Sequence, residues 1–128
     1  MADRTTRERL VLVVDDHEGM RSLLCAVFEL EMPDVKIVEA HSAREAISQW
    51  LAHRPDVVVL DQMLGTKLGL EDVAVPILSD RPDQRIVVFT AFLHDELRQR
   101  ASALGIDDVL SQDDLRRLPS IVARLLAD

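Results

Sequence analysis

Short apolar segments that alternate with helical segments constrain the fold of this chain more than any other feature. Segments rich in β-branched residues are expected as strands at 10–14, 35–38, 57–60, 86–89 and, more weakly, 109–110. They show little polar alternation, which is typical of parallel strands that are buried on both faces. The sequence therefore predicts an α/β fold, a doubly wound five-stranded parallel sheet with helices on both sides.

The segments between the strands carry helix signals. Apolar residues at helical spacing predict a helix from about 18 to 30. Ser42 and Glu45 match a capping box, which predicts the start of a second helix. Its buried face is expected to contain Ala46, Ile47, Trp50 and Leu51. A further helix is expected over about 93–104, ending at Gly105.

Two prolines affect the remaining helices. Pro76 lies inside the third helical segment, so that helix is expected to be kinked, broken or shifted. Pro119 suits the first turn of a last helix over about 118–127, preceded by a looser turn at 113–117.

Composition limits the possible classes of protein. The 128 residues suit a single domain spanning 1–128, and the net charge of −8 argues against nucleic-acid binding by this domain. The single cysteine, Cys25, excludes an intrachain disulfide and is expected as a buried thiol in a reducing cytoplasm. Neither a signal peptide nor a membrane helix is expected, so we predict a cytoplasmic protein without membrane contact.

Polar residues follow three of the expected strands directly. Asp15 and Asp16 follow the first strand, Asp61 the third, and Thr90 the fourth. In open α/β sheets, ligands bind beyond the carboxyl ends of the strands, so these side chains are expected to converge. Clustered carboxylates repel one another unless a cation or a proton joins them, and Mg²⁺ prefers such oxygen ligands.

Asp15 and Asp16 alone also fit a simpler interpretation, in which one carboxylate caps the following helix. Asp61 at the end of a separate strand favours a joint site over that interpretation.

From Leu10 to Leu126 the sequence resembles the receiver domains of bacterial two-component response regulators. LVLVVDDHEGMRSLL resembles the family's first strand, acidic pair and first helix, and VVVLDQMLGTKLGL its phosphoacceptor strand and loop, with Gly69 at the expected spacing. FTA at 89–91 supplies the hydroxyl position, and ALGIDDVLSQDDL resembles the fifth-strand segment. The resemblance implies a flavodoxin-like (βα)5 fold with strand order 2-1-3-4-5.

The resemblance also implies roles for individual residues. Asp61 would accept a phosphoryl group from the phosphohistidine of a sensor histidine kinase or phosphotransfer protein. Asp15, Asp16, Asp61 and the backbone carbonyl of Met63 would hold Mg²⁺. Thr90 would bind the phosphoryl group and move toward it on activation.

The sequence departs from the family pattern at three positions. Gln112 stands where the family has a lysine that pairs with a phosphoryl oxygen, which should weaken the switch about tenfold. Val109 stands where an aromatic ring commonly swings inward, so it is expected as a plain core residue. Gly65 replaces a proline and should leave its loop freer to move.

Apolar residues are expected near the path of the water that would remove the phosphoryl group. Met63 lies two residues beyond Asp61, and Phe92 lies two residues beyond Thr90, so we expect slow autodephosphorylation. Separately, the resemblance implies a switch region that includes Thr90, Val109 and Phe92. His17 is expected as a first-turn helix residue, although the DDH pattern resembles regulators that carry a helix-turn-helix output domain.

Three functions remain open from the sequence. A working receiver would catalyse its own phosphorylation and dephosphorylation without turning over an external substrate. A degenerate receiver would bind partners independently of phosphorylation. A phosphatase or nucleotide-binding enzyme is disfavoured, because GxxxxGK[ST] and GxGxxG are absent and no second acid follows Asp61 closely.

The sequence also leaves the assembly open. The chain ends at Asp128 as the last expected helix finishes. It is either a natural single-domain regulator acting on a downstream protein or part of a longer DNA-binding regulator with an output domain. The sequence also leaves open whether the chain forms a homodimer.

Overall fold

The computed structural model describes residues 8–65 and 68–127. The first seven residues, where the sequence predicts no signal peptide, lie outside the described part. The elements are β1 (Arg9–Val14), α1 (Glu18–Glu31), β2 (Val35–Ala40), α2 (Ala43–His53), β3 (Val57–Leu60), α3 (Gly69–Asp80), β4 (Arg85–Thr90), α4 (Asp95–Ala103), β5 (Asp108–Ser111), a 3-10 helix (Gln112–Arg117) and α5 (Leu118–Ala127).

The five strands form one parallel sheet in the order β2-β1-β3-β4-β5, which confirms the predicted topology. Val14 at the end of β1 lies opposite Leu60 at the end of β3. The residues that follow these two, Asp15 and Asp61, are therefore brought to the same edge of the sheet.

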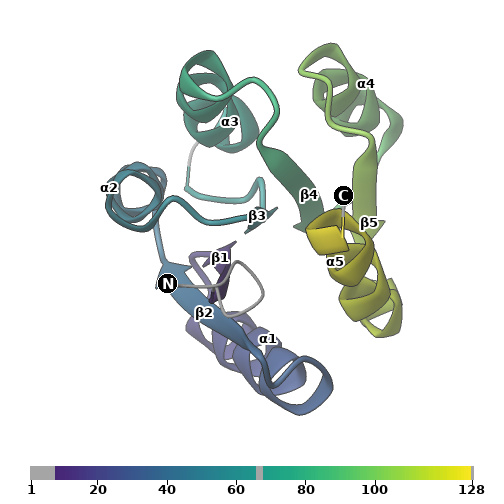
Figure 1. Cartoon of the computed structure of the whole chain (residues 1–128). Coiled ribbons are helices and arrows are strands. Elements are labelled where there is room, and N and C mark those ends of the chain that lie inside the picture. Colours follow the sequence, from purple (N-terminus) through teal and green to yellow (C-terminus); the bar gives the residue numbers. More distant parts are fainter. Residues whose placement is uncertain (1–7, 66–67, 128) are drawn as a thin grey trace.

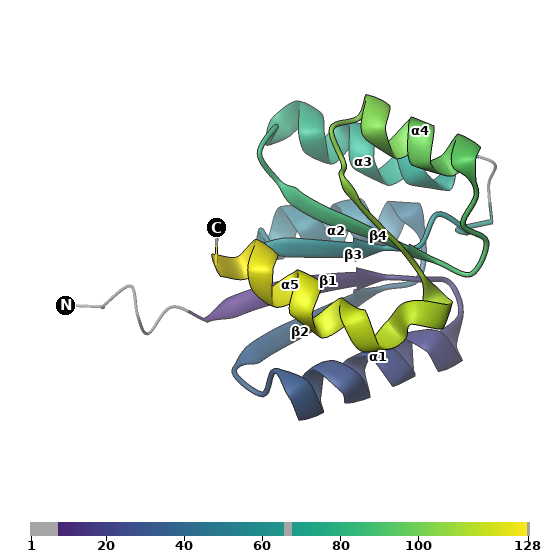
Figure 2. The same cartoon turned by 90° about the vertical axis from the view of Figure 1, so that its right-hand side faces the viewer.

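Helices cover both faces of the sheet. In Figures 1 and 2, α1 and α5 lie on one face and α2, α3 and α4 on the other. Because successive side chains of a strand point to opposite faces, Val11 and Val13 pack toward α1 and α5, while Leu12 and Val14 pack toward the other three helices. The core therefore has two halves, one on each side of the sheet.

Helix α2 follows its start signal but not all of its predicted packing. The Ser42 hydroxyl accepts a hydrogen bond from the Glu45 N–H at 3.1 Å. The Glu45 carboxylate accepts from the N–H of His41 rather than that of Ser42, so only half of the capping box forms. Ala46 and Trp50 are buried, whereas Leu51 is 55% exposed and its prediction as a buried residue was wrong.

Helix α3 runs from Gly69 to Asp80 without a break at Pro76, so of the three predicted outcomes, a kinked, broken or shifted helix, the break was wrong. Pro76 lies on the exposed side of α3.

Cys25 is half-buried rather than fully buried. Burial and the neighbouring Glu39 carboxylate raise the pKa of its thiol to about 11. The thiol therefore stays protonated and unreactive at neutral pH. Among the described residues, no helix combines the length and apolar character needed to cross a membrane.

Candidate functional site

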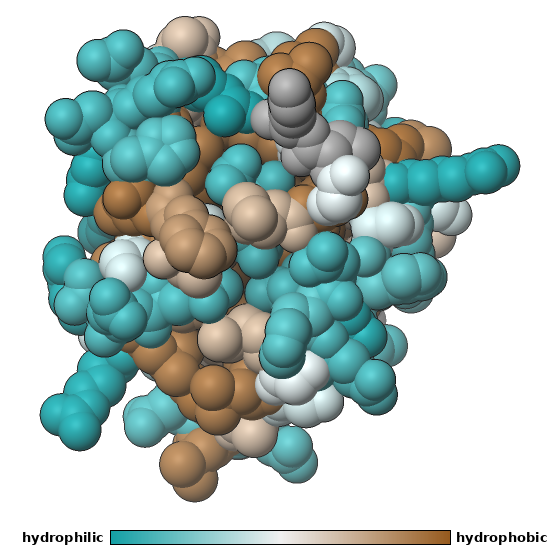
Figure 3. All heavy atoms as spheres, turned by 180° about the vertical axis from the view of Figure 1, so that it is seen from behind, coloured by the Kyte–Doolittle hydropathy of each residue, from teal (hydrophilic) through white to brown (hydrophobic). Residues whose placement is uncertain are grey.

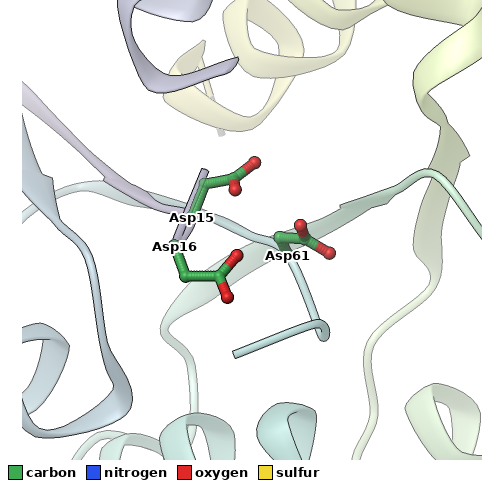
Figure 4. A group of neighbouring side chains, drawn as sticks. All are labelled: Asp15, Asp16 and Asp61. Carbon is green, nitrogen blue, oxygen red and sulfur yellow. The ribbon is translucent and has the colours of Figure 1, made fainter. Parts of the chain in front are cut away.

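Three carboxylates meet where β1 and β3 end. Asp15 and Asp16 follow β1, and Asp61 follows β3 (Figure 4). Each offers a ligand atom within 4.8 Å of those of the other two. The predicted convergence of these residues is confirmed.

Backbone hydrogen bonds hold this acidic cluster in register with the sheet. The Asp15 N–H donates to the Ala40 carbonyl at 3.1 Å, and the Asp61 N–H donates to the Val14 carbonyl at 2.9 Å. Asp15 is 1% exposed and Asp61 7% exposed, whereas Asp16 is exposed. The cluster therefore has a buried floor and one accessible carboxylate.

Burial makes the cluster hard to ionise. Desolvation is the main cause that raises the pKa of Asp61 from 3.8 to about 7, and the charges of Asp15 and Asp16 add to it. Hydrogen bonds from Met63 and Thr90 act in the opposite direction. Desolvation also raises the pKa of Asp15. A bound cation would relieve this repulsion.

The oxygen atoms of the cluster fit a hard divalent cation. Asp15 Oδ1 accepts a hydrogen bond from the His17 N–H at 2.8 Å, and Asp61 Oδ1 accepts from the Met63 N–H at 3.1 Å. Asp15 Oδ2 is buried and has no hydrogen-bond partner among the described residues. A buried carboxylate oxygen without a partner is costly, and Mg²⁺ is the kind of ligand that would satisfy it.

A cavity of about 240 Å³ opens beside the three carboxylates. Its other lining residues are His17, Met20, Met63, Ala91, Phe92 and Gln112. Met63 is 43% exposed and Phe92 64% exposed, so apolar side chains border the opening. Figure 3 looks at the face on which the strands end and shows apolar side chains across its middle, continuing toward α1.

Thr90 lies at the buried end of β4, and its hydroxyl is near enough to Asp61 to lower the pKa of that carboxyl, against the larger effect of burial. Its hydroxyl oxygen also lies 3.4 Å from the N–H of Phe92, which donates to it. Thr90 thus connects Asp61 to the segment between β4 and α4.

The two unusual positions near β5 differ in their relation to the cavity. Gln112 begins the 3-10 helix and lines the cavity. The neighbouring Ser111 hydroxyl accepts from the Asp113 N–H, so it serves as a cap. Val109 is half-buried and packs against the core on the α2, α3 and α4 side, as predicted for a plain core residue.

Two glycines shape the segment that follows Asp61. Gly69 starts α3 so close to this segment that a Cβ atom there would lie 2.1 Å from the Gln62 carbonyl oxygen. Gly65 has a φ of 82°, which proline cannot adopt. The backbone at position 65 therefore follows a path that a proline there would not allow.

The sequence interpretation missed two residues at the start of α1. His17 is not a first-turn residue but the N-cap, because its Nδ1 accepts a hydrogen bond from the Met20 N–H at 3.1 Å. Arg21 donates from Nη1 to the Asp15 carbonyl oxygen at 2.8 Å. Long helical side chains point back toward the helix N-terminus, and this rule, applied to Arg21, was the available signal.

Comparison with known proteins agrees with this geometry. The model of the response regulator receiver domain family matches residues 11–123. The chain is 36% identical over 104 residues to the DNA-binding transcriptional activator DevR/DosR of Mycobacterium tuberculosis, covering 80% of this chain and 47% of that protein. It is 30% identical over 101 residues to the response regulator protein VraR of Staphylococcus aureus, covering 78% and 47%. The chain thus spans about half the length of these curated relatives.

A solved structure supports the same fold. The signal receiver domain of a DNA-binding response regulator from Colwellia psychrerythraea superposes with a TM-score of 0.85 at 22% identity, covering 94% of this chain and all of that one. The family match over residues 11–123 and this superposition agree with the five-stranded sheet described above. The chain belongs to the response regulator receiver domain family.

Proposed function

We propose that this receiver domain accepts a phosphoryl group on the carboxylate of Asp61. The donor would be the phosphohistidine of a sensor histidine kinase or a phosphotransfer protein. Asp15, Asp16, Asp61 and the Met63 carbonyl would hold Mg²⁺ beside the acceptor. One observation carries the proposal: three carboxylates lie within 4.8 Å of one another, and one buried oxygen of Asp15 lacks a partner among the described residues.

The proposed transfer is a displacement at phosphorus. An Asp61 carboxylate oxygen forms a bond to phosphorus while the phosphorus–nitrogen bond of the phosphohistidine breaks, and the imidazole leaves with the bonding electrons. Mg²⁺, when bound, supplies positive charge that offsets the charge of the phosphoryl oxygens. Asp61 has to be ionised to react, and a divalent cation beside it would favour the ionised carboxylate.

Thr90 and Gln112 would contact the phosphoryl group. The Thr90 hydroxyl lies near enough to Asp61 to lower the pKa of its carboxyl, so it could reach a phosphoryl group on that residue. Gln112 lines the cavity and offers neutral N–H donors in place of an ammonium group. The charge-assisted contact that the family lysine makes is therefore replaced by a weaker one.

The proposed output is a surface change that depends on phosphorylation. A shift of Thr90 toward the phosphoryl group would move the segment before α4, because Phe92 donates to the Thr90 hydroxyl. The readers of this change would be a downstream protein, an output domain of a longer regulator or a second copy of the chain. The half-length match to DevR/DosR, a DNA-binding activator by name, favours the output domain.

A second candidate is a degenerate receiver that binds its partners independently of phosphorylation. Gln112 and Val109 favour it, since neither the lysine nor the swinging ring of the family is present. It predicts that the domain binds its partner equally well with and without a phosphodonor.

Intact-mass spectrometry distinguishes the two candidates. The protein is incubated with Mg²⁺ and a small-molecule phosphodonor, and a control reaction contains EDTA. We expect one added phosphoryl group that disappears in EDTA and in Asp61→Asn. Asp107→Asn is the matched control, because this exposed carboxylate precedes β5 and lies at the opposite edge of the sheet. An unmodified wild-type protein would favour the degenerate receiver.

A further inference from the structure

Arg21 is an arginine with little exposure to solvent. It lies one turn into α1, and its side chain is only 17% exposed. Arginine is rarely this buried unless its charge is paired. The groups that contact the Arg21 side chain therefore show what offsets the cost of burying its charge.

The Arg21 guanidinium joins three parts of the fold. Its Nη1 donates to the backbone carbonyl of Asp15 at 2.8 Å, just after β1. Its Nε lies 3.4 Å from Glu39 Oε1 on β2. Arg21 thus ties α1 to the ends of two neighbouring strands.

Two other polar groups of Asp15, its N–H and Oδ1, are held by separate partners, whereas Oδ2 has none among the described residues. The Asp15 N–H donates to the Ala40 carbonyl, and Asp15 Oδ1 accepts from the His17 N–H. The carbonyl that Arg21 binds belongs to the peptide unit that joins Asp15 to Asp16. Because a peptide unit is planar, fixing its oxygen fixes the direction in which the chain continues to Asp16.

We propose that Arg21 is a positioning residue for the divalent cation, because it orients the peptide that links the two acidic residues at the end of β1. This inference rests on the proposed function, in which Asp15 and Asp16 hold Mg²⁺. Arg21 itself lies outside the set of proposed ligands. Its role is to keep the two carboxylates facing Asp61 before the cation arrives.

The charge of Arg21 alone would have the opposite effect on binding. A positive charge near the site repels Mg²⁺, so its removal without any loss of geometry would strengthen binding. Glu39 lies beside the guanidinium and offsets part of that charge. The charge of Arg21 also lowers the pKa of Asp15, against the larger effect of burial. The sign of the change in Mg²⁺ affinity therefore separates positioning from simple electrostatics.

Isothermal titration calorimetry of the unphosphorylated full chain with Mg²⁺ tests the proposal. We expect Arg21→Ala to bind Mg²⁺ about tenfold more weakly than the wild type, the lower end of what loss of an outer partner of a metal ligand costs. Arg21→Lys keeps the charge and one donor, so it should recover part of the affinity. Arg44→Ala removes an exposed arginine from α2 and should bind like the wild type.

Circular dichroism in EDTA establishes that each variant is folded before titration. If Arg21→Ala is unfolded, Arg21→Gln, which keeps an N–H donor without the charge, takes its place and should still bind more weakly than the wild type. Affinity equal to or tighter than that of the wild type in these variants would overturn the positioning role while leaving the proposed function intact. A wild-type protein that does not bind Mg²⁺ would overturn the proposed function and this inference together.

Discussion

Asp61 combines two properties that oppose each other in the metal-free protein. Its place at the end of β3 buries it next to two other carboxylates, and this raises its pKa to about 7. The same burial places its oxygens where a cation can bind. Because ionised carboxylates are disfavoured there, the acidic cluster should lower the free energy of unfolding of the metal-free protein at neutral pH.

The first prediction concerns stability against pH without metal. Between 3.8 and about 7, folded Asp61 binds more protons than the unfolded chain does, so the free energy of unfolding should fall as pH rises through this range and level off above it. The two pKa values correspond to roughly 4 kcal/mol, so Asp61→Asn should be stabilised by about 2–4 kcal/mol at pH 8 and unchanged near pH 3.

Urea unfolding in EDTA at several pH values measures this effect. Asp107→Asn, at the opposite edge of the sheet, should follow the wild type at every pH. A parallel pH profile for wild type and Asp61→Asn would show that Asp61 ionises freely, contrary to the burial seen here.

The second prediction concerns Gln112, which lines the cavity where a lysine would pair with a phosphoryl oxygen. Gln112→Lys should bind beryllium trifluoride, a phosphoryl mimic, roughly tenfold more tightly in the presence of Mg²⁺, because a charged donor replaces a neutral one. Fluorine NMR titration provides the affinities. Gln112→Met, which lacks any donor, is the control and should bind more weakly than the wild type. Equal affinity in all three proteins would remove position 112 from the site.

The third prediction concerns loss of the phosphoryl group. Met63 and Phe92 border the cavity with apolar surface, so an attacking water is poorly ordered and autodephosphorylation should be slow. Met63→Gln should hydrolyse roughly tenfold faster, since a polar side chain there can orient water. Time-resolved intact mass after removal of the phosphodonor gives the rates. Leu51 is also an exposed apolar residue, but it lies on α2, and Leu51→Gln should therefore leave the rate unchanged. Loss of the wild-type phosphoryl group within seconds would contradict the hypothesis.

At the scale of elements, helix α4 is tied to α3 by a partly buried ion pair. Arg100 Nε donates to Glu71 Oε2 at 2.8 Å, and Arg100 Nη2 lies 2.5 Å from Glu71 Oε1. The two side chains are 22% and 26% exposed, and the pair lowers the pKa of Glu71. The pair therefore joins α3 to α4 through two contacts of one guanidinium group.

The fourth prediction is that the Glu71–Arg100 pair stabilises the fold more than an exposed pair does. A double-mutant cycle to alanine, measured by urea unfolding, should give a coupling energy of about 1–2 kcal/mol, because the contact is bidentate and partly buried. The Arg54–Asp80 pair, about half exposed on both sides, should give less than about 0.5 kcal/mol. Similar values for the two pairs would show that burial adds nothing.

The elements differ in how far the sequence predicts them. Apolar runs were sufficient for the parallel sheet, and the residues that follow the strands were sufficient for the meeting of Asp15, Asp16 and Asp61. The strand order came from the resemblance to receiver domains. Leu51 was misassigned because a helical repeat gives a face but not its width. For Pro76 the sequence left a kinked, broken or shifted helix open, because a local pattern does not tell which of these an interior proline causes, and the structure excludes the break.

Contacts between separate elements could not be read from the sequence. Trp50 was expected in the core, but its Nε1–H donates at 2.8 Å to buried Gln84, thirty-four positions further along the chain. Arg21 on α1 likewise pairs with Glu39 on β2, eighteen positions further along the chain. Such contacts depend on the tertiary fold, which a local pattern does not contain.

At the scale of the whole molecule, the groups that would take part in the proposed function lie at one edge of the sheet. The carboxyl ends of β1, β3 and β4 bring together the acidic cluster, Thr90 and the cavity, while the two core layers hold the strands in register. The chain belongs to the receiver domain family, and the relatives that it matches over about half their length are a transcriptional activator and a response regulator by name. The proposed function therefore depends on Asp61 being the phosphoryl acceptor.

The most direct measurement locates the phosphoryl group in the sequence. The protein is treated with a phosphodonor and Mg²⁺, the acyl phosphate is reduced with borohydride to homoserine, and peptides are mapped by tandem mass spectrometry. If Asp61 is the phosphoryl acceptor, homoserine should appear at position 61 alone, and none should appear when EDTA replaces Mg²⁺. Homoserine at position 15 or 16, or labelling that does not depend on Mg²⁺, would contradict the assignment of Asp61.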